Sequence, residues 1–204
     1  NNICVPKTYL QTQEAVNAIE QRQLTWPVVV KPRKGSASAH ISYCHDQDRL
    51  ESAFKSCPNP MIQEFLDGPE YGYDLFGNKE YQLISVFCKK KLVMRAGETD
   101  KAVSTADPQI IEFGQKIGMA MNLCGPIDVD VIIDKEGPKL LEINPRFGGG
   151  YPCSHLAGAD YFKKLIDMHE GKNLTPDIGS CPDGICMLKQ DEIISPSWNH
   201  LINQ

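Results

Sequence analysis

The sequence predicts an α+β protein built as two lobes of antiparallel sheet with packed helices. Three observations favour this class. Helical and strand-like patterns alternate along the chain, short turn signals typical of hairpins separate the strand-like runs of the middle section, and the sequence DGPE after residue 66 interrupts the pattern. We therefore expect a small lobe over residues 1–66, a large lobe over residues 67–192 and a tail over residues 193–204.

In the first lobe, a helix is expected over residues 12–23, followed by the apolar, β-branched strand VVVK at residues 28–31. A second strand is expected near residues 38–44. The next helix has a clear start, because Asp46 is of a type that caps helix N-termini and the apolar residues after it recur at helical spacing. The prolines of CPNP, residues 57–60, end that helix, and MIQEFL follows as a strand.

The second lobe begins with the strand-like runs EYGYDLFGN, EYQLISVFC and KLVMRAG. Between the last two, the basic run from Lys89 to Lys91 is short enough to form the tip of a hairpin. Asp107 and Pro108 form an N-cap and first-turn pair for a helix that ends near Asn122. This section therefore predicts antiparallel sheet with one covering helix.

The end of the second lobe predicts a hairpin, a helix and a last strand. IDVDVIID and KLLEIN have the composition of strands, and the turn-forming KEGP lies between them. Asp160 is expected to cap a long helix that Gly171 ends. A final strand is expected near CMLKQ.

The composition is ordinary for a soluble globular protein and argues against two classes of partner. Of the 204 residues, 41% are hydrophobic and 23% are charged, which allows a sizeable core. A formal net charge of -5 gives no electrostatic case for binding nucleic acid. No apolar segment approaches the roughly 20 residues that span a bilayer, and the first residues lack the pattern of a signal peptide. We expect a soluble cytoplasmic protein with no nucleic-acid or membrane partner.

The eight cysteines are scattered along the chain, and no pair has CxxC spacing. A chain of this length does not need disulfides to hold its core together. We interpret the cysteines as reduced structural thiols, rather than as disulfides or zinc ligands.

The most informative stretch is LLEINPRFGGGYP, where polar groups occupy every second position of an apolar strand. If this strand and IDVDVIID form a hairpin centred near residue 136, Asp130 lies opposite Glu142 and Asp128 opposite Asn144, all on one face. Facing carboxylates repel each other without a cation between them. Oxygen ligands in this number suit Mg²⁺, which fills its remaining positions with water and phosphate oxygens.

Arg146 and the three glycines after it bear on the same interpretation. Arg146 follows two residues after Asn144, and its planar guanidinium matches phosphate or carboxylate. The glycines Gly148 to Gly150 allow the backbone to approach a ligand closely. The alternative is a polar edge whose alternation only keeps one face in contact with water. Such an edge requires neither the arginine nor the glycines, so we favour the metal site.

Two further segments are compatible with nucleotide binding. Lys31 ends an apolar strand beside a loop of small residues that includes Ser36, and an ammonium with loop N–H groups can hold phosphate. In MIQEFLDGPE, Phe65 and Leu66 would offer backbone groups and apolar area to an adenine ring. Taken singly, a surface lysine before a turn and a plain strand–turn–strand are the simpler interpretations.

The order VVVKP, small-residue loop, xIQEFxxGxE, DVDV and LEINPR resembles the ATP-grasp superfamily, most closely the nucleotide-binding domain of the carbamoyl-phosphate synthase large chain and its relatives. The resemblance covers residues 3–190 approximately. It implies an ATP-grasp fold whose two lobes clamp ATP together with Mg²⁺, for which Mn²⁺ can substitute.

The resemblance also implies a role for each matching position. The implied nucleotide contacts are Lys31, Ser36, Gln63, Glu64, Phe65, Leu66 and Glu70, of which Lys31 meets the phosphates, Glu64 to Leu66 form the adenine hinge and Glu70 binds the ribose. The implied metal ligands are Asp130, Glu142 and Asn144. The implied catalytic groups are Arg146, beside the transferred phosphoryl group, and Arg95 and Lys101, which would hold an acyl phosphate or a substrate carboxylate.

The activity implied by the resemblance is ADP-forming ligation, which joins a small carboxylate to an amine or ammonia through an acyl phosphate. The loop after Lys31 has fewer glycines than is usual in the family, and Asp130 stands where carbamoyl-phosphate synthases commonly have glutamine. The family's additional N-terminal domain is expected to be absent, so we expect this fragment to be inactive alone and the full-length protein to be able to form a homo-oligomer.

Two other functions compete with the ligase. The first is a nucleotide-binding or regulatory module that has kept the fold without turnover, which the altered loop favours. The second is an α+β interaction domain without a nucleotide site. Binding of ATP analogues and of metal to the acidic hairpin would separate the second from the others.

Overall fold

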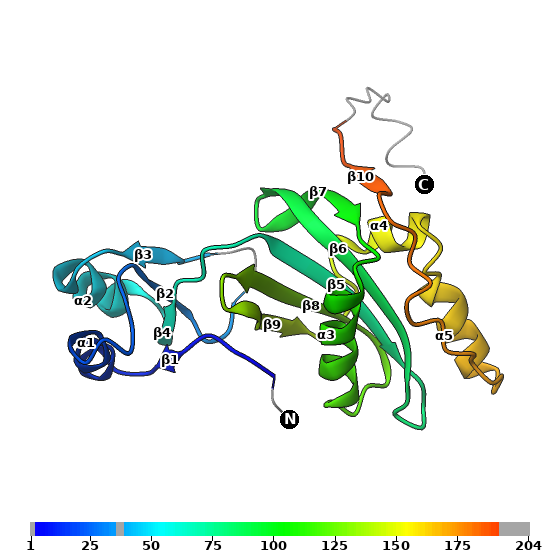
Figure 1. Ribbon diagram of the computed structural model, residues 1–204, viewed down its shortest axis with the longest axis horizontal. Coiled ribbons are helices and arrows are strands. Elements are labelled where there is room, and N and C mark those ends of the chain that lie inside the picture. Colours follow the sequence, from blue (N-terminus) through cyan, green and yellow to red (C-terminus); the bar gives the residue numbers. More distant parts are fainter. Residues whose placement is uncertain (1–2, 36–38, 192–204) are drawn as a thin grey trace, which may run out of the picture.

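The computed structural model describes residues 3–35 and 39–191, and it contains two antiparallel sheets that are each packed against helices (Figure 1). The smaller sheet has the strand order β1-β4-β2-β3, and the larger has the order β10-β7-β6-β5-β8-β9. The predicted α+β class with two lobes of antiparallel sheet is therefore confirmed. The expected boundary at residue 66 falls in the segment between the sheets and stays a prediction, and the expected tail lies outside the described residues.

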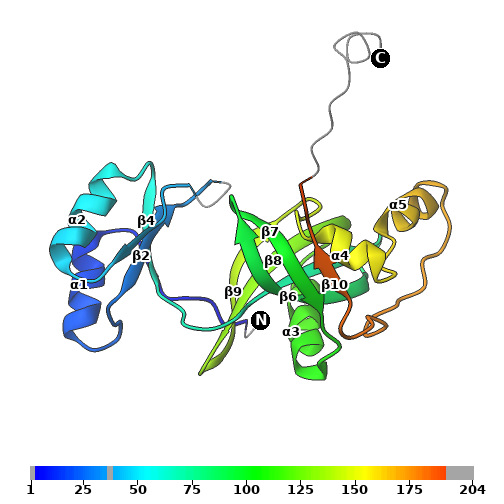
Figure 2. The same cartoon turned by 90° about the horizontal axis from the view of Figure 1, so that it is seen from above.

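The small lobe has helices on one side of its sheet. Its elements are β1 (Thr8–Tyr9), α1 (Thr12–Glu20), β2 (Val28–Pro32), β3 (Ser42–Cys44), α2 (Gln47–Ser56) and β4 (Pro60–Glu64). Figure 2 shows both helices on the side of the sheet that faces away from the large lobe. Val28 and Val30 of β2 and Ile62 of β4 are fully buried in one apolar cluster with Ala15 and Leu50 from the helices. The predicted run VVVK is thus the central core strand of this lobe.

The large lobe has helices on both faces of its sheet. Its elements are β5 (Glu70–Gly77), β6 (Leu83–Arg95), β7 (Glu98–Ser104), α3 (Pro108–Met119), β8 (Gly125–Asp134), β9 (Gly137–Asn144), α4 (Tyr151–Leu156), α5 (Tyr161–His169) and β10 (Cys186–Leu188). Leu75 belongs to the core under α3, whereas the next residue, Phe76, belongs to the core with Tyr151 and Tyr161 of α4 and α5. Because side chains alternate along β5, this strand contributes to the core on both faces of the sheet.

The helix starts predicted from capping residues are confirmed. The side chains of Asp46, Asp107 and Asp160 each accept a hydrogen bond from a backbone N–H in the first turn of α2, α3 and α5. Helix ends were less well predicted, because α1 stops at Glu20 and α3 at Met119, before the expected positions. A side-chain cap can be recognised from a few neighbouring residues, whereas the residue at which a helix ends cannot.

The predicted hairpin tip at Lys89 to Lys91 is wrong. These lysines lie inside β6, which runs without interruption to Arg95, and the hairpin instead turns at Ala96 and Gly97, both with positive φ. A strand can contain this run because Lys89 is completely buried beside Asp74 and the side chain of Lys91 is paired with acidic groups. The charges are compensated by neighbouring strands rather than by water.

The predicted register of the β8–β9 hairpin is confirmed. Asp130 pairs with Glu142, and Asp128 pairs with Asn144. The turn is tight, with Asp134 opposite Gly137. An extra residue in β9, Leu141, forms a bulge that shifts the pairing by one residue, which brings Glu142 opposite Asp130. The four polar side chains therefore share one face, as expected.

Other elements differ from expectation in extent. The strand expected over residues 38–44 is limited to β3, with residues 36–38 outside the described part of the chain. β7 and α4 were not predicted as separate elements, whereas the strand expected near CMLKQ is confirmed as β10. Among the helices of the described residues, none has the length and apolarity to cross a membrane.

Candidate functional site

One face of the large sheet carries charged side chains on four neighbouring strands. Gly72 of β5 pairs with Lys89 of β6 and with Asp130 of β8, and Asp130 in turn pairs with Glu142 of β9. Side chains two positions apart on a strand point to the same face. The residues that share this face are Glu70, Asp74, Lys89, Lys91, Asp128, Asp130, Glu142 and Asn144.

Lys91 joins two of the predicted ligand residues. Its Nζ lies 2.7 Å from Glu70 Oε1 and 2.7 Å from Asp130 Oδ1, and the side chain is only 6% exposed. Burial alone would lower the pKa of Lys91, but the carboxylates of Asp130 and Glu70 outweigh burial and raise this pKa above its ordinary value. The ammonium is therefore charged at neutral pH.

The carboxylate of Asp130 is only partly compensated. Burial raises the pKa of Asp130 to about 6, although Lys91 opposes the rise. Its Oδ1 is paired with Lys91 Nζ at 2.7 Å, and no other donor in the described residues reaches this buried atom. Within the described residues, the cation that contacts this buried carboxylate is therefore the ammonium of Lys91.

Glu142 and Asn144 offer further oxygen atoms beside Asp130. Glu142 is exposed, and within the described chain its side chain makes no hydrogen bond or ion pair. Asn144 directs its Nδ2 toward Asp128 Oδ2 at 3.5 Å, which leaves the amide oxygen available. These residues fit Mg²⁺ in the sense that two carboxylates and an amide present hard oxygen ligands.

This set is not a complete metal cage by itself. Across residues 3–35 and 39–191, no group of three or more His, Cys, Asp or Glu side chains is arranged to hold a metal ion. Mg²⁺ typically takes few protein ligands and completes its shell with water and substrate phosphates. The donor set therefore suits an ion that arrives with a phosphate ligand.

Arg146 and two of the three glycines lie against the side chains of Asp128 and Lys89. Arg146 Nη1 donates to Asp128 Oδ2 at 3.0 Å. A Cβ at Gly148 would lie 2.4 Å from Asp128 Oδ1, and a Cβ at Gly150 would lie 2.6 Å from Lys89 Cε. The space that the sequence assigned to a ligand is thus filled by the protein's own side chains at two of the three glycines.

Lys31 approaches the same acidic residues from the small lobe. Burial lowers the pKa of Lys31, and the charges of Glu142 and Asp130 oppose this effect. An ammonium at the end of β2 therefore shares the electrostatic environment of the hairpin on β8 and β9, although the two belong to different sheets. Ser36, the other predicted phosphate contact, lies outside the described residues.

The predicted adenine hinge follows β4. Gln63 and Glu64 direct their side chains to the protein, since Gln63 Nε2 donates to Thr8 Oγ1 at 3.1 Å and Glu64 Oε1 accepts from Lys139 at 3.2 Å. By contrast, no backbone hydrogen bond among the described residues uses the N–H or carbonyl groups of Phe65 or Leu66. Backbone groups of this kind are what an adenine edge requires.

A cavity of about 270 Å³ adjoins the hinge and the hairpin. It lies between the N-terminal segment and β9, and its lining includes Thr8, Gln63, Leu140 and Glu142. The cavity therefore connects the small-lobe strand that leads into the hinge with one of the predicted metal ligands.

Arg95 and Lys101 are not brought to the acidic hairpin. Arg95 Nε donates to Asp100 Oδ1 at 3.0 Å, and its Nη1 donates to Asp191. Lys101 is exposed on β7, and within the described residues it forms no ion pair. The catalytic roles of these two residues stay predictions.

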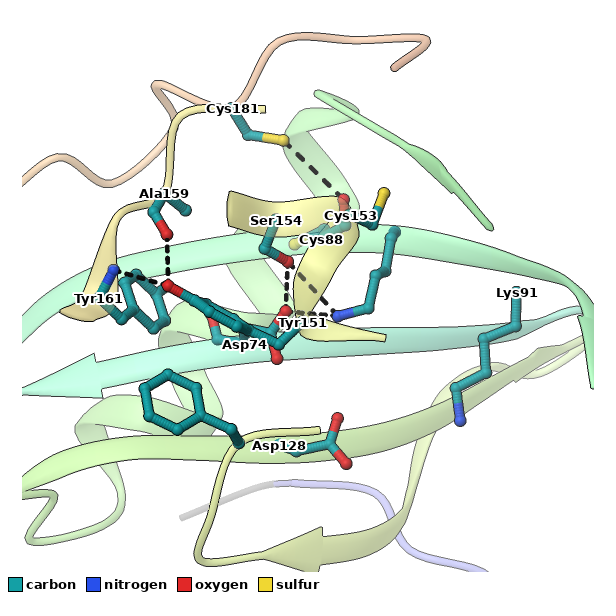
Figure 3. Close-up of polar contacts among 12 residues, drawn as sticks. Asp74, Cys88, Lys91, Asp128, Tyr151, Cys153, Ser154, Ala159, Tyr161 and Cys181 are labelled. Atoms are coloured by element: carbon teal, nitrogen blue, oxygen red, sulfur yellow. Dashed lines mark hydrogen bonds and ion pairs between the residues drawn. The ribbon is translucent and has the colours of Figure 1, made fainter. Parts of the chain in front are cut away.

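Next to Lys91 on the same face lies a closed polar cluster that the sequence did not predict (Figure 3). Lys89 Nζ lies 2.5 Å from Asp74 Oδ2, with side chains that are 0% and 3% exposed. Ser154 of α4 donates to the same carboxylate, and Tyr161 Oη donates to the Asp74 carbonyl at 2.8 Å. In the same view, no hydrogen bond or ion pair joins Lys91 to the residues of this cluster that are drawn.

Asp128 and Lys91 are the site residues that sequence reasoning left unassigned. Asp128 was placed opposite Asn144 but was given no role, and Lys91 was assigned to a turn. A signal was present for both, because Asp128 continues the alternation that contains Asp130, and Lys89 and Lys91 have the same spacing as Glu70, Gly72 and Asp74.

The residues and their order correspond to a described protein family. The model of the ATP-grasp domain family matches residues 1–150, which contain Lys31, the hinge and the acidic hairpin. The chain belongs to the ATP-grasp domain family. ATP-grasp proteins of this kind are ATP-dependent ligases, and the predicted resemblance is confirmed.

The curated relatives include one protein of unassigned activity and two ligases. The uncharacterized protein y4rH of Sinorhizobium fredii is 26% identical over 70% of this chain and 33% of that protein. D-alanine–D-alanine ligase of Bacillus anthracis is 25% identical over 78% of this chain and 58% of that enzyme. Carbamoyl phosphate synthase large chain of Lachnoclostridium phytofermentans is 28% identical over 70% and 15%, respectively. This chain thus spans less than two thirds of each relative.

Solved structures confirm the fold. The biotin carboxylase domain of Hydrogenobacter thermophilus 2-oxoglutarate carboxylase, in complex with MgADP, ADP and bicarbonate, is similar with a TM-score of 0.74 and 17% identity, over 89% of this chain and 45% of that chain. N5-carboxyaminoimidazole synthetase from Staphylococcus aureus, complexed with ADP, has a TM-score of 0.68 and 17% identity, over 85% and 48%. ATP-grasp homologues therefore bind adenine nucleotide on this fold.

Proposed function

We propose that this chain is the ATP-binding catalytic domain of an ADP-forming carboxylate ligase that acts through an acyl phosphate, as carbamoyl-phosphate synthase does. The observation that carries the proposal is the convergence of Asp130, Glu142 and Asn144 on one face of the hairpin, with Lys31 of the other lobe in the same electrostatic environment. A site that clamps a nucleotide between two lobes requires contacting residues on both lobes.

In this proposal each residue binds or orients one part of the nucleotide. The backbone groups of Phe65 and Leu66 pair with adenine, and Glu70 accepts hydrogen bonds from the ribose hydroxyls. Lys31 contacts the phosphates as a point charge. Asp130, Glu142 and Asn144 hold Mg²⁺, whose chemistry when bound is to neutralise charge on the phosphate oxygens.

The reaction then needs two displacements that the protein positions. An oxygen of the small carboxylate attacks the γ-phosphorus, the bond to the β–γ bridging oxygen breaks, and ADP leaves. The nitrogen of an amine or ammonia next attacks the acyl carbon, and phosphate leaves. Arg146 stabilises the transferred phosphoryl group, while Arg95 and Lys101 hold the carboxylate, so that the reacting atoms are aligned.

A non-catalytic nucleotide-binding or regulatory module is the second candidate. This candidate is favoured because two of the proposed catalytic guanidinium groups already have carboxylate partners. Arg146 is paired with Asp128, and Arg95 is paired with Asp100 and Asp191. Turnover requires these guanidinium groups to exchange their partners when substrate binds. A module that only binds nucleotide requires no such exchange.

Binding of MgADP tests the nucleotide site. We expect isothermal titration calorimetry to detect binding to the wild-type chain, and we expect the double variant Glu142→Ala, Asn144→Ala to bind at least about tenfold more weakly, because metal ligands are lost. Glu112→Ala is the matched control, as Glu112 lies on α3 with a 62% exposed side chain. Equal MgADP affinity in the double variant and the control would contradict the proposal.

Turnover then separates the two candidates. ADP release is measured with the longest available form of the protein, against a panel of small carboxylates with ammonia or amines. Carboxylate-dependent ADP release supports the ligase, and tight MgADP binding without release under every condition supports the regulatory module.

A further inference from the structure

Lys91 reaches across a whole strand to contact a predicted metal ligand. It lies on β6, whereas Asp130 lies on β8, and β5 runs between them. Two strand spacings amount to about 10 Å, so the side chain must pass over β5. It does so at Gly72, where a Cβ would stand 3.4 Å from Lys91 Cε. A Cβ at this position would be in ordinary van der Waals contact with Lys91, so the lysine passes over β5 close to the backbone of Gly72.

The ammonium of Lys91 binds both ends of the proposed nucleotide site. Glu70 is the proposed ribose ligand, and Asp130 is a proposed metal ligand, and each has an oxygen 2.7 Å from Lys91 Nζ. Glu142, directly opposite Asp130, has no partner in the described part of the chain. The ammonium of Lys91 thus neutralises two carboxylates, one that is proposed to bind the ribose and one that is proposed to bind the metal.

We propose that Lys91 is a resident cation of this site, which makes binding of a divalent metal depend on the nucleotide. Lys91 stays paired with Glu70 and Asp130 until a metal–nucleotide complex binds. The ribose then contacts Glu70, and the metal contacts Asp130. A divalent ion alone must displace a paired ammonium from Asp130 without the energy of the ribose contact. This inference rests on the proposed nucleotide function and assigns Lys91 as a positioning residue within it.

The sign of the effect follows from Coulomb's law. A unit positive charge next to Asp130 repels an incoming divalent cation, and the repulsion is only partly screened because the side chains of Lys91 and Asp130 are 6% and 16% exposed. Removing the charge of Lys91 frees two carboxylates and adds to the attraction for metal. The metal affinity measured without nucleotide should therefore rise, and the gain in metal affinity produced by nucleotide should shrink.

The test is Mn²⁺ binding without nucleotide, measured from the electron paramagnetic resonance signal of free Mn²⁺. We expect Lys91→Met to bind Mn²⁺ at least about tenfold more tightly than wild type, a difference of roughly 1.4 kcal/mol. Lys90→Met is the matched control, because it removes the same charge from the neighbouring position on the other face of β6. It should change the affinity less than about twofold, since its side chain points to the face of the sheet opposite to that of Asp130.

A second pair of variants locates the ion. Adding Glu142→Ala and Asn144→Ala to Lys91→Met should abolish the tighter Mn²⁺ binding. Persistence of tight binding would place the ion elsewhere and overturn the proposal, as would unchanged or weaker Mn²⁺ binding in Lys91→Met. Lys91→Gln, which keeps a long polar side chain without charge, replaces Lys91→Met if circular dichroism shows that the latter is unfolded.

Nucleotide dependence distinguishes this inference from the proposed function. In wild type, ADP should increase Mn²⁺ affinity strongly, and in Lys91→Met the increase should be at least about tenfold smaller. If ADP has no effect on Mn²⁺ binding in wild type, the proposed nucleotide function fails, whatever Lys91 does. If ADP increases Mn²⁺ affinity equally in both proteins, the proposed function stands and the role of Lys91 is refuted.

Discussion

Two lysines on the same strand, two residues apart, are bound in different ways. Lys89 is fully buried, and its partner Asp74 also accepts a hydrogen bond from Ser154. Lys91 bridges two carboxylates, those of Glu70 and Asp130, whose side chains are 30% and 16% exposed. The comparison shows how one polar face can contain a structural cluster and a ligand site side by side.

The helix α4 makes the difference between the two lysines. It covers Lys89 and supplies Ser154, and its first turn comes close because Gly150 precedes it without a side chain. The carboxylates around Lys91 are more exposed, and the neighbouring Glu142 has no partner among residues 3–35 and 39–191. A cluster that is closed and satisfied stabilises the fold, whereas one that is open and incomplete can accept a ligand.

Breaking the closed cluster should have the largest effect on stability. Lys89→Met leaves Asp74 buried without its counter-charge, and loss of one member of a buried pair typically costs about 3–5 kcal/mol. We expect a decrease of this size in the free energy of unfolding, measured by urea denaturation. Lys90→Met, on the same strand, should change it by less than about 0.5 kcal/mol. A similar loss in both variants would show that the burial of Lys89 is not what matters.

Closing the space above Lys89 should have an intermediate effect. In Gly150→Ala the new Cβ would lie 2.6 Å from Lys89 Cε, so the lysine or α4 must move. Such overpacking typically costs about 1–3 kcal/mol, which thermal unfolding would report as a lower Tm. Gly149→Ala is the control, since its Cβ would approach nothing nearer than 3.4 Å. Equal Tm values for the two variants would argue against close packing of α4 on Lys89.

Substitution in the open cluster should affect stability least. Glu142 is exposed and without a partner in the described residues, so Glu142→Gln should change the free energy of unfolding by less than about 0.5 kcal/mol. Its loss of charge should nevertheless weaken Mg²⁺-dependent nucleotide binding. Urea denaturation and calorimetry on the same sample measure both effects. A large loss of stability would assign Glu142 a structural role and would remove the contrast between the clusters.

The sequence predicted best those features that depend on local chemistry. Asp46, Asp107 and Asp160 marked helix starts because a side-chain cap needs only the next three residues. The facing of Asp130 and Glu142 followed from a short hairpin, whose register depends on its own turn and alternation. The family pattern then supplied the proposed adenine hinge and the proposed metal ligands as a set.

The features missed by the sequence depend on distant contacts. Lys89 and its partner Asp74 are 15 residues apart, and Lys91 and Glu70 are 21 apart, so the basic run in isolation has the pattern of an exposed turn. α4 has only six residues, and it is held by the burial of Tyr151 and Cys153 rather than by helix propensity. The contacts of Lys91 with Glu70 and Asp130 involve three strands, which no local sequence pattern brings together.

Because of the bulge in the β8–β9 hairpin, the strand between the turn and the site can lose a residue without changing which residues form the site. Pairing is offset by one residue on the two sides of the bulge, which lies at Leu141, so loss of that residue would leave Glu142 opposite Asp130 and keep an unbroken ladder. The bend and extra twist that a bulge gives to its strand would disappear. A one-residue deletion among homologues could thus preserve the fold and every ligand identity while changing the direction in which those ligands point.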